Sequence, residues 1–212
     1  MTDLILALDV TGKKKALTLA RVCAPHVDAI KLGYPLILST GLSIVRELEE
    51  EDLPLIADFK VADIPNTCQL IVEQVFDAGF SSVICHGFTG RDAIQACVDT
   101  TADYGGACFV VAEMSHPGGS EFFGGEISEH IARLAMECGA DGIIAPATRQ
   151  DRVRVLRDIV RGRKILSPGI GVQGGDADCI AGLVDGIIVG RAIYEAEDPM
   201  GAAMAFNRFR SG

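Results

Sequence analysis

Eight short apolar runs recur along the chain, and each is followed by a longer stretch whose apolar residues have helical spacing. Most of these runs are continuously apolar, which is typical of parallel strands covered on both faces. Eight such units without a linker favour closure of the sheet. The sequence therefore predicts an α/β fold, a (β/α)8 TIM barrel formed by residues 1–212 as one domain, with a doubly wound open sheet as the alternative. The predicted strands are 4–9, 27–33, 54–59, 81–87, 107–113, 141–146, 164–169 and 185–190.

Helical spacing is clearest after the third and fifth predicted strands. Apolar residues there recur three or four positions apart, which places them on one face of a helix. These residues are Ile64, Cys68, Ile71, Val72 and Val75 in the first stretch, and Ile127, Ile131, Leu134 and Cys138 in the second. Both patterns predict amphipathic helices between the strands.

The charge of the chain narrows the classes of partner. A formal net charge of −10 argues against nucleic acid or an anionic membrane surface as the main partner. An anionic ligand would have to be bound by a local group of cations. Residues 1–9 have no basic region before their apolar stretch, and no apolar run is long enough to span a membrane, so we expect neither a signal peptide nor a membrane segment.

The seven cysteines form no CxxC pair, and several stand in apolar surroundings such as SSVICHG (81–87). We interpret them as small buried residues in a reducing cytoplasm. The spacing of the cysteines does not indicate a metal site, and the sequence shows neither an HExxH motif nor a carboxylate cage. The sequence therefore predicts a cytoplasmic protein without a bound metal.

Polar residues collect at the ends of the predicted strands, where active sites of this fold lie. They are Asp9, Lys31, Asp58, Lys60, His86, Glu113 and Ser167. Any one of them alone is compatible with a rim salt bridge, and His86 is interpreted as a hydrogen-bonded structural histidine. Four charged residues that converge from the first three strands predict a functional site.

The segment IADFKVADIPNT (56–67) concentrates this signal in three charged residues. Asp58 and Lys60 are two positions apart, so they would share a face of a strand, and the following turn would bring Asp63 beside them. Between two carboxylates, Lys60 would stay protonated and could donate a proton. The alternative is a structural ion pair with Asp63 as the cap of the next helix.

Two glycine-rich segments after the seventh and eighth predicted strands indicate a phosphate site. These are SPGIGVQGGD (167–176) and VGRAIY (189–194). Loops at these two positions commonly bind phosphate in such barrels, and glycines let backbone amides approach an anion. Gln173 would donate an amide hydrogen bond and Arg191 a bidentate charged one. The alternative is that the glycines only form turns and Arg191 only faces solvent.

The segment after the fifth predicted strand contains a candidate ligand contact and a candidate lid. Ser115 could donate a hydrogen bond to a ligand heteroatom, or it could be a turn serine. Residues 118–125 (GGSEFFGG) place glycines on both sides of two phenylalanines, which predicts a mobile lid.

The motifs resemble those of one family, orotidine 5'-monophosphate decarboxylase in its short archaeal-type form. The resemblance extends over nearly the whole chain, and the DxKxxDIPxT element is specific to the family. The matching motifs are LALD, IKLGYP, IADFKVADIPNT, EMSHPG, SPGIGVQGGD and IIVGRAIY. The resemblance implies a lyase that removes CO2 from orotidine monophosphate to give uridine monophosphate, in pyrimidine biosynthesis, with neither metal nor organic cofactor.

The resemblance also implies roles for individual residues. Lys31, Asp58, Lys60 and Asp63 would form the alternating charged tetrad of the family. In this tetrad Asp58 would lie against the substrate carboxylate, and Lys60 would protonate the carbon that CO2 leaves. Asp63 and Thr67 would reach into the active site of a partner subunit near the ribose, which implies a homodimer.

The other implied contacts belong to the nucleotide itself. Asp9 and Lys31 would hold ribose hydroxyls, and Ser115 would hold the pyrimidine. Gln173 and Arg191 would bind the phosphate. The remaining positions expected to contact or close over the substrate are Ile64, Pro168, Ile170 and Gly190.

Two other functions remain open on the sequence. A related magnesium-dependent sugar-phosphate decarboxylase or aldolase also carries the Asp-x-Lys-x-x-Asp motif, but its metal needs further carboxylate ligands. Here Asp9 and Asp58 would have to supply them, beside Lys31, a poor metal partner. A nucleotide-binding barrel without catalytic activity is the second alternative.

Overall fold

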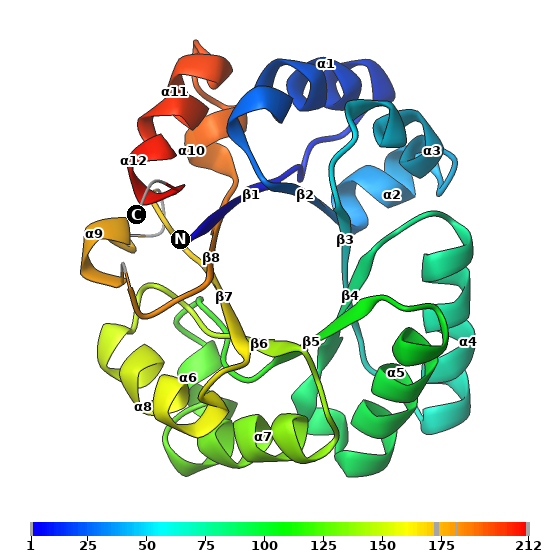
Figure 1. The fold of residues 1–212 in the computed structure, drawn as a ribbon, viewed down its shortest axis with the longest axis vertical. Helices are drawn as coiled ribbons and strands as arrows, with labels where there is room; N and C mark the ends of the chain where they lie inside the picture. Colours follow the sequence, from blue (N-terminus) through cyan, green and yellow to red (C-terminus); the bar gives the residue numbers. More distant parts are fainter. Residues whose placement is uncertain (1, 172–173, 181, 211–212) are drawn as a thin grey trace.

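The eight predicted strands form a closed parallel barrel (Figure 1). The computed structural model describes residues 2–171, 174–180 and 182–210. Each strand pairs with its neighbours in chain order, and β1 closes the ring against β8. The strands are β1 (Asp3–Ala7), β2 (Ala29–Gly33), β3 (Leu55–Val61), β4 (Ser82–His86), β5 (Ala107–Val111), β6 (Gly142–Ile144), β7 (Lys164–Pro168) and β8 (Gly186–Val189).

The predicted barrel is therefore confirmed, and the open-sheet alternative is wrong. The predicted strand boundaries differ from the observed ones by a few residues, mainly at the carboxyl ends. Asp9, for example, was placed in the first strand but follows β1 in a loop. Polar residues such as this one lie beyond the last paired residue, where the chain turns over the rim.

Helices surround the barrel on its outer side (Figure 1). The longer ones are α1 (Lys13–Cys23), α4 (Pro65–Asp77), α5 (Arg91–Asp103), α7 (Glu126–Glu137) and α8 (Gln150–Val160). Shorter ones occupy the remaining connections: α2 (Tyr34–Thr40), α3 (Ile44–Leu48), α6 (Gly119–Phe122), α9 (Ala177–Ile180), α10 (Arg191–Tyr194), α11 (Pro199–Ala205), α12 (Asn207–Arg210), and the 3-10 turns η1 (Ala24–His26), η2 (Glu49–Glu51) and η3 (Gly87–Thr89). In the described part of the chain, no helix has the length and apolar character needed to cross a bilayer.

The two helical patterns predicted from the sequence correspond to α4 and α7. Cys68, Val72 and Val75 are buried on α4, but Ile64 precedes that helix and is 66% exposed. On α7, Ile131 and Leu134 are buried, whereas Ile127 is 53% exposed. The inner face of each helix is thus shorter than predicted, because its first apolar residue lies in the exposed first turn or before it.

The core has two parts, separated by the wall of the barrel. The larger part lies between strands and helices, and the smaller part fills the inside of the barrel. The inner cluster includes Ile5, Ala7, Ala29, Ile56, Ile84, Phe109, Val111, Ile144, Leu166 and Ile188. The interior is therefore packed with side chains, as expected for eight strands.

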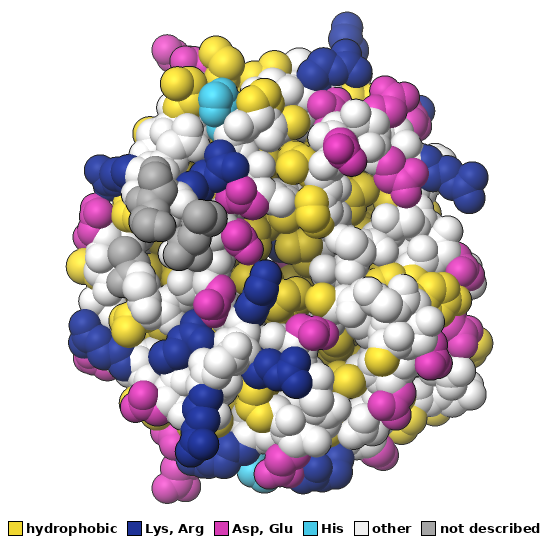
Figure 2. Space-filling view, in the orientation of Figure 1, with side chains coloured by type: hydrophobic (Ala, Val, Ile, Leu, Met, Phe, Trp, Pro, Cys, Tyr) yellow, Lys and Arg dark blue, Asp and Glu magenta, His cyan; other side chains and the backbone are white. Residues whose placement is uncertain are grey.

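A hollow of about 390 Å³ lies at the amino ends of the strands. Its floor includes Ile56 and Phe109, and charged side chains on its edge form ion pairs such as Lys164 with Asp3. On the face seen in Figure 2, hydrophobic side chains likewise surround a central depression edged by acidic and basic groups. The charged residues singled out in the sequence lie at the opposite, carboxyl ends of the strands.

Candidate active site

Three charged side chains from β2 and β3 form a continuous chain of ion pairs. The Nζ atom of Lys31 lies 2.5 Å from Oδ2 of Asp58, and Nζ of Lys60 lies 2.7 Å from Oδ1. Lys31 is only 4% exposed, so a carboxylate partner is needed to offset the cost of burying its ammonium group. The two oxygens of Asp58 are thus each occupied by one ammonium group.

The path of β3 explains how Asp58 and Lys60 meet. Ala57 pairs with Val83 of β4, whereas Val61 pairs with Cys85, so β3 contains two more residues than its neighbour over this stretch. Lys60 lies within this irregularity and has a left-handed φ of 46°. The predicted contact exists, but a bulge produces it rather than the regular alternation of a strand.

The two ammonium groups determine the charge of Asp58. Burial raises the pKa of this carboxyl, but Lys31 and then Lys60 lower it through their charges and hydrogen bonds, and the pKa ends below its usual value. Asp58 is therefore ionised near neutral pH. The site contains a carboxylate held between two cations.

Asp9 adds a second carboxylate beside Lys31, with 3.7 Å between Oδ2 of Asp9 and Nζ of Lys31. Its position requires glycine at residue 33, because a Cβ there would lie 2.4 Å from Oδ1 of Asp9. The close approach of β2 to the loop after β1 thus places the first predicted carboxylate at the cavity.

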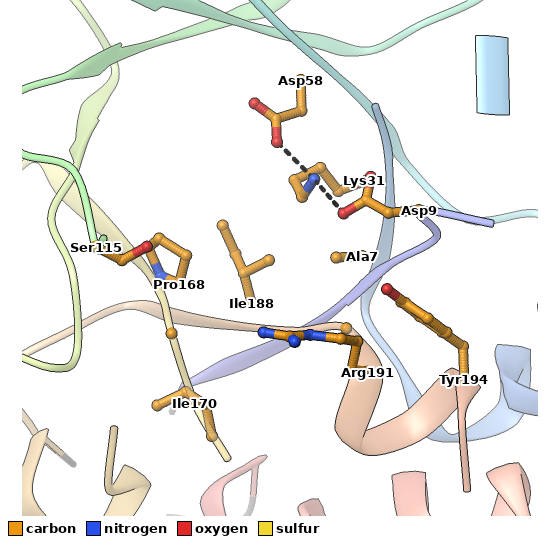
Figure 3. A pocket seen from close by; sticks show the side chains of 12 residues that line it. Ala7, Asp9, Lys31, Asp58, Ser115, Pro168, Ile170, Ile188, Arg191 and Tyr194 are labelled. Atoms are coloured by element: carbon orange, nitrogen blue, oxygen red, sulfur yellow. Dashed lines mark hydrogen bonds and ion pairs between the residues drawn. The ribbon is translucent and has the colours of Figure 1, made fainter. Parts of the chain in front are cut away.

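The charged residues line a cavity at the carboxyl ends of the strands (Figure 3). It has a volume of about 170 Å³, and an adjoining hollow of about 180 Å³ contains Lys60. Lys31, Asp58, Ser115, Pro168 and Ile188 line both hollows. One continuous site therefore has the charged chain on one wall and an apolar floor.

Arg191 stands on the opposite side of this cavity, as the first residue of α10, directly after Gly190. In Figure 3 its side chain extends across the pocket below Ile188. Within the described part of the chain, the guanidinium of Arg191 has no ion-pair partner. An exposed, unpaired cation at the edge of a cavity is suited to an anionic group.

The loop after β7 forms the neighbouring wall. Pro168 and Ile170 line the cavity, and Ile170 is 6% exposed. Positive φ angles of 97° at Gly169 and 79° at Gly171 turn the backbone back, and Gly175 donates from its backbone N–H to the Gly169 carbonyl at 2.9 Å. The predicted contact Gln173 lies outside the described residues.

The segment after β5 brings Ser115 to the cavity, as predicted (Figure 3). Beyond it, the candidate lid contains the single helical turn α6, with Phe122 69% exposed. Phe123 instead packs on His86, with ring centroids 5.3 Å apart. The mobility of this segment stays a prediction.

Asp63, Ile64 and Thr67 do not line either hollow. Among the described residues Lys60 forms its ion pair with Asp58 and not with Asp63, so the predicted return of Asp63 is wrong within one chain. Asp63 is exposed, and its Oδ1 accepts a hydrogen bond from the backbone N–H of Ile64 at 2.7 Å. Asp63 is not the helix cap either, because Ile64 occupies that position. The turn after β3 directs these residues to the outside of their own barrel.

Two residues have surroundings that the sequence did not indicate. Tyr194 lines the cavity one turn after Arg191, and burial, followed by the charge of Asp9, raises its pKa. His86 was interpreted as hydrogen-bonded, but its buried Nδ1 has no partner among the described residues. Burial and then the charge of Lys60 lower the pKa of His86 to about 4, against a smaller opposing effect of Asp58. The sequence signal for the position of Tyr194 is its place within VGRAIY, a segment predicted to bind phosphate.

Ser167, another polar residue at a strand end, serves the structure. Ser167 is buried and donates to the Ala145 carbonyl at 2.7 Å.

All seven cysteines, which lie in the described part, are free, and Cys179 alone among them is exposed. No group of three or more His, Cys, Asp or Glu side chains in the described ranges has a geometry that could hold a metal ion.

The comparisons of this sequence with a family model and with individual proteins agree on one family. Residues 2–206 match the sequence model of the Orotidine 5'-phosphate decarboxylase / HUMPS family. The orotidine 5'-phosphate decarboxylase of Methanosarcina barkeri is 57% identical over 202 residues, covering 94% of this chain and 90% of the relative. That of Thermococcus kodakarensis is 46% identical over 203 residues, covering 94% and 92%.

Solved structures agree with the sequence comparison. The orotidine 5'-monophosphate decarboxylase of Methanocaldococcus jannaschii, in complex with the inhibitor BMP, superposes with a TM-score of 0.95 at 36% identity, over 100% of both chains. The orotidine 5'-phosphate decarboxylase of Pyrococcus horikoshii superposes with a TM-score of 0.89 at 43% identity, over 99% of both.

Proposed function

Because this chain belongs to the Orotidine 5'-phosphate decarboxylase / HUMPS family, we propose that it converts orotidine 5'-monophosphate to uridine 5'-monophosphate and CO2 without a metal. The relatives that it matches are enzymes named for this reaction. The observation that carries the proposal is the carboxylate of Asp58 between the ammonium groups of Lys31 and Lys60, on the wall of the cavity.

The chemistry needs a cation near the reacting carbon. Loss of CO2 leaves a carbanion with little delocalisation, so a fixed positive charge must stabilise it. Lys60 has this charge, and its Nζ is oriented by Asp58. When the C–C bond breaks, its electron pair stays on the ring carbon, and Lys60 supplies the proton that forms the new C–H bond.

Asp58 acts on the group that leaves. With the substrate carboxylate placed against it, the two negative charges repel, and this repulsion is relieved when neutral CO2 departs. The low pKa of Asp58 keeps its charge at neutral pH. The same carboxylate holds both lysines, so a single residue contributes the repulsion and positions the acid.

The other wall would bind the nucleotide away from the reacting carbon. Arg191, with Gln173, would hold the phosphate, and Ser115 the pyrimidine, while Asp9 and Lys31 would hold ribose hydroxyls. Ile64, Pro168, Ile170 and Gly190 would complete the contacts. Binding energy from the phosphate can hold the base in its reactive position and so accelerate a step that Arg191 never touches.

The proposed active enzyme is a homodimer in which Asp63 and Thr67 enter the site of the partner subunit. The exposed turn that contains Asp63 supports this arrangement, because Asp63 has no ion-pair partner among the described residues of its own chain. Asp63 would then be the fourth member of the tetrad with Lys31, Asp58 and Lys60. The whole of residues 1–212 would act as one catalytic domain in the cytoplasm.

The magnesium-dependent alternative fits the donor set poorly. Both oxygens of Asp58 are bound by lysines, and Asp9, the other carboxylate that lines the first hollow, lies beside the buried cation of Lys31. A divalent cation would have to displace these ammonium groups. Asp58 is therefore proposed to act as an unmetallated carboxylate.

Replacement of Lys60 tests the assigned acid. The Lys60→Ala variant should lose at least about 10³-fold in kcat, because it lacks both the proton donor and the stabilising charge. Its affinity for uridine monophosphate, measured by calorimetry, should change less than about tenfold, since other residues bind the nucleotide. Retained turnover, or loss of nucleotide binding in a folded variant, would contradict the assignment.

A further inference from the structure

Glu113 is a buried charge that the proposed chemistry does not use. In the described part of the chain, only Glu113, at 1% exposed, and Lys31, at 4%, are charged residues in the buried class. Glu113 follows β5 and lies two residues before Ser115, in the wall of the hollow that contains Lys60. A carboxylate at this depth needs cationic partners, because removing a charge from water is costly unless an opposite charge compensates it.

Two arginines at the start of α8 provide these partners. Nη1 of Arg149 lies 2.7 Å from Oε1 of Glu113, and Nε of Arg152 lies 3.4 Å from Oε2. Arg149 is the residue before α8, and Arg152 lies in its first turn. One carboxylate therefore fixes two guanidinium groups at the start of a single helix.

Each arginine also holds one end of the segment that follows Ser115. Nη2 of Arg149 donates to the carbonyl of His116 at 3.2 Å. Nη2 of Arg152 donates to the carbonyl of Gly125 at 2.8 Å and to Oγ of Ser128 at 2.6 Å. The segment 116–125, which contains α6, is thus held at its start by one guanidinium and at its end by the other.

We propose that Glu113, Arg149 and Arg152 form a clamp that positions Ser115 and residues 116–125 over the cavity. Glu113 is a positioning residue, because it acts on the segment only through the two arginines. The clamp rests on the proposed function in one respect, that Ser115 contacts the pyrimidine. Its ligand is accordingly the base of the nucleotide rather than the phosphate, which belongs to Arg191 on the other wall.

The chain offers a matched control for a change in the clamp. Arg157, also on α8, lies close to Asp185 and donates to the carbonyls of Leu183 and Arg163 at 2.9 and 2.8 Å. It has the same chemistry as Arg149 but holds the chain near the start of β7 and β8, away from both hollows. Arg149→Lys and Arg157→Lys therefore remove equivalent guanidinium contacts while each keeps its charge.

The test compares two ligands and three variants by calorimetry. In Glu113→Gln and in Arg149→Lys, the affinity for uridine monophosphate should fall by about tenfold, which is the effect of one charge-assisted hydrogen bond. The affinity for ribose 5-phosphate should not change in either variant. Arg157→Lys should change neither affinity. Amide hydrogen exchange of 116–125 should be faster in the first two variants and unchanged in the third.

Two results would overturn the clamp. One is a loss of affinity that is as large for ribose 5-phosphate as for uridine monophosphate, or as large in Arg157→Lys as in the clamp variants. Either outcome would show a general structural effect. The other is an Arg149→Lys variant with unchanged affinity for uridine monophosphate and unchanged amide hydrogen exchange. This variant keeps the buried ion pair, so it tests the clamp even if Glu113→Gln does not fold. Failure of the proposed function is distinguishable, because the unmodified protein would then show no decarboxylation at all.

Discussion

Lys60 has a left-handed backbone, which costs a non-glycine residue about 1–2 kcal/mol. The strain is local to the residue whose Nζ lies 2.7 Å from Asp58. Strained residues of this kind persist where surrounding contacts fix them, commonly at active sites. The sequence indicated that Asp58 and Lys60 belong together, but not this conformation, because a bulge depends on the register with β4 and leaves no pattern in the residues themselves.

His86 provides a pH-dependent prediction at the same scale. Its folded pKa of about 4 lies below its usual value of 6.5, so the unfolded chain binds a proton that the folded chain does not between these values. The stability from neutral His86 is present above about pH 6.5 and is lost as pH falls towards about 4. The free energy of unfolding in urea should therefore fall between pH 7 and pH 5, and it should fall less in His86→Gln.

The control for this prediction is His130→Gln, which replaces an exposed histidine on α7. This variant should keep the pH dependence of the unmodified protein. Equal slopes in all three proteins would show that His86 is not the group that titrates.

At the scale of elements, α10 presents Arg191 to the cavity and β7 presents Pro168. The sequence predicts both residues, because they belong to the glycine-rich segments after the last two strands, and in a barrel these loops lie at the face where ligands bind. The turn after β3 was predicted less well. Asp63 was expected to fold back because it follows Lys60 closely, but its carboxylate bonds to the next backbone N–H and turns outward.

Arg191→Ala tests the role of α10. For orotidine monophosphate, kcat/KM should fall roughly 100-fold, because a bidentate charged contact to the phosphate is lost. For orotidine, which lacks the phosphate, kcat/KM should change less than about threefold. Arg154→Ala is the matched control, because Arg154 is exposed and, among the residues that the structure describes, forms its ion pair with Asp151 on the same helix. An equal loss for both substrates would contradict a phosphate role for Arg191.

At the scale of the whole molecule, one barrel brings residues from β1, β2, β3 and the β5, β7 and β8 loops to a single cavity. The strand order made this predictable, because carboxyl ends of parallel strands meet on one face. Asp63, Ile64 and Thr67 remain outside, and a single sequence has no signal for which exposed turn meets a partner subunit. The role proposed for them depends on an assembly of two subunits.

Mixing two inactive variants tests that assembly. Lys60→Ala and Asp63→Asn should each be nearly inactive alone. If each site takes Lys60 from one subunit and Asp63 from the other, equal mixing after subunit exchange should restore about a quarter of the activity, since half the dimers have one intact site. Lys60→Ala mixed with Asp58→Asn should restore none, because these residues belong to the same subunit. Equal recovery in both mixtures, or none in either, would contradict the shared site.

The most direct test of the account follows the ultraviolet absorbance of orotidine monophosphate with the purified protein in excess EDTA, because decarboxylation changes the chromophore of the ring. The account predicts rapid loss of the substrate signal, with uridine monophosphate as the product and the same rate with and without the chelator. No change in absorbance with a folded protein, or activity that returns only when magnesium is restored, would contradict a metal-free decarboxylase built on Asp58 and Lys60.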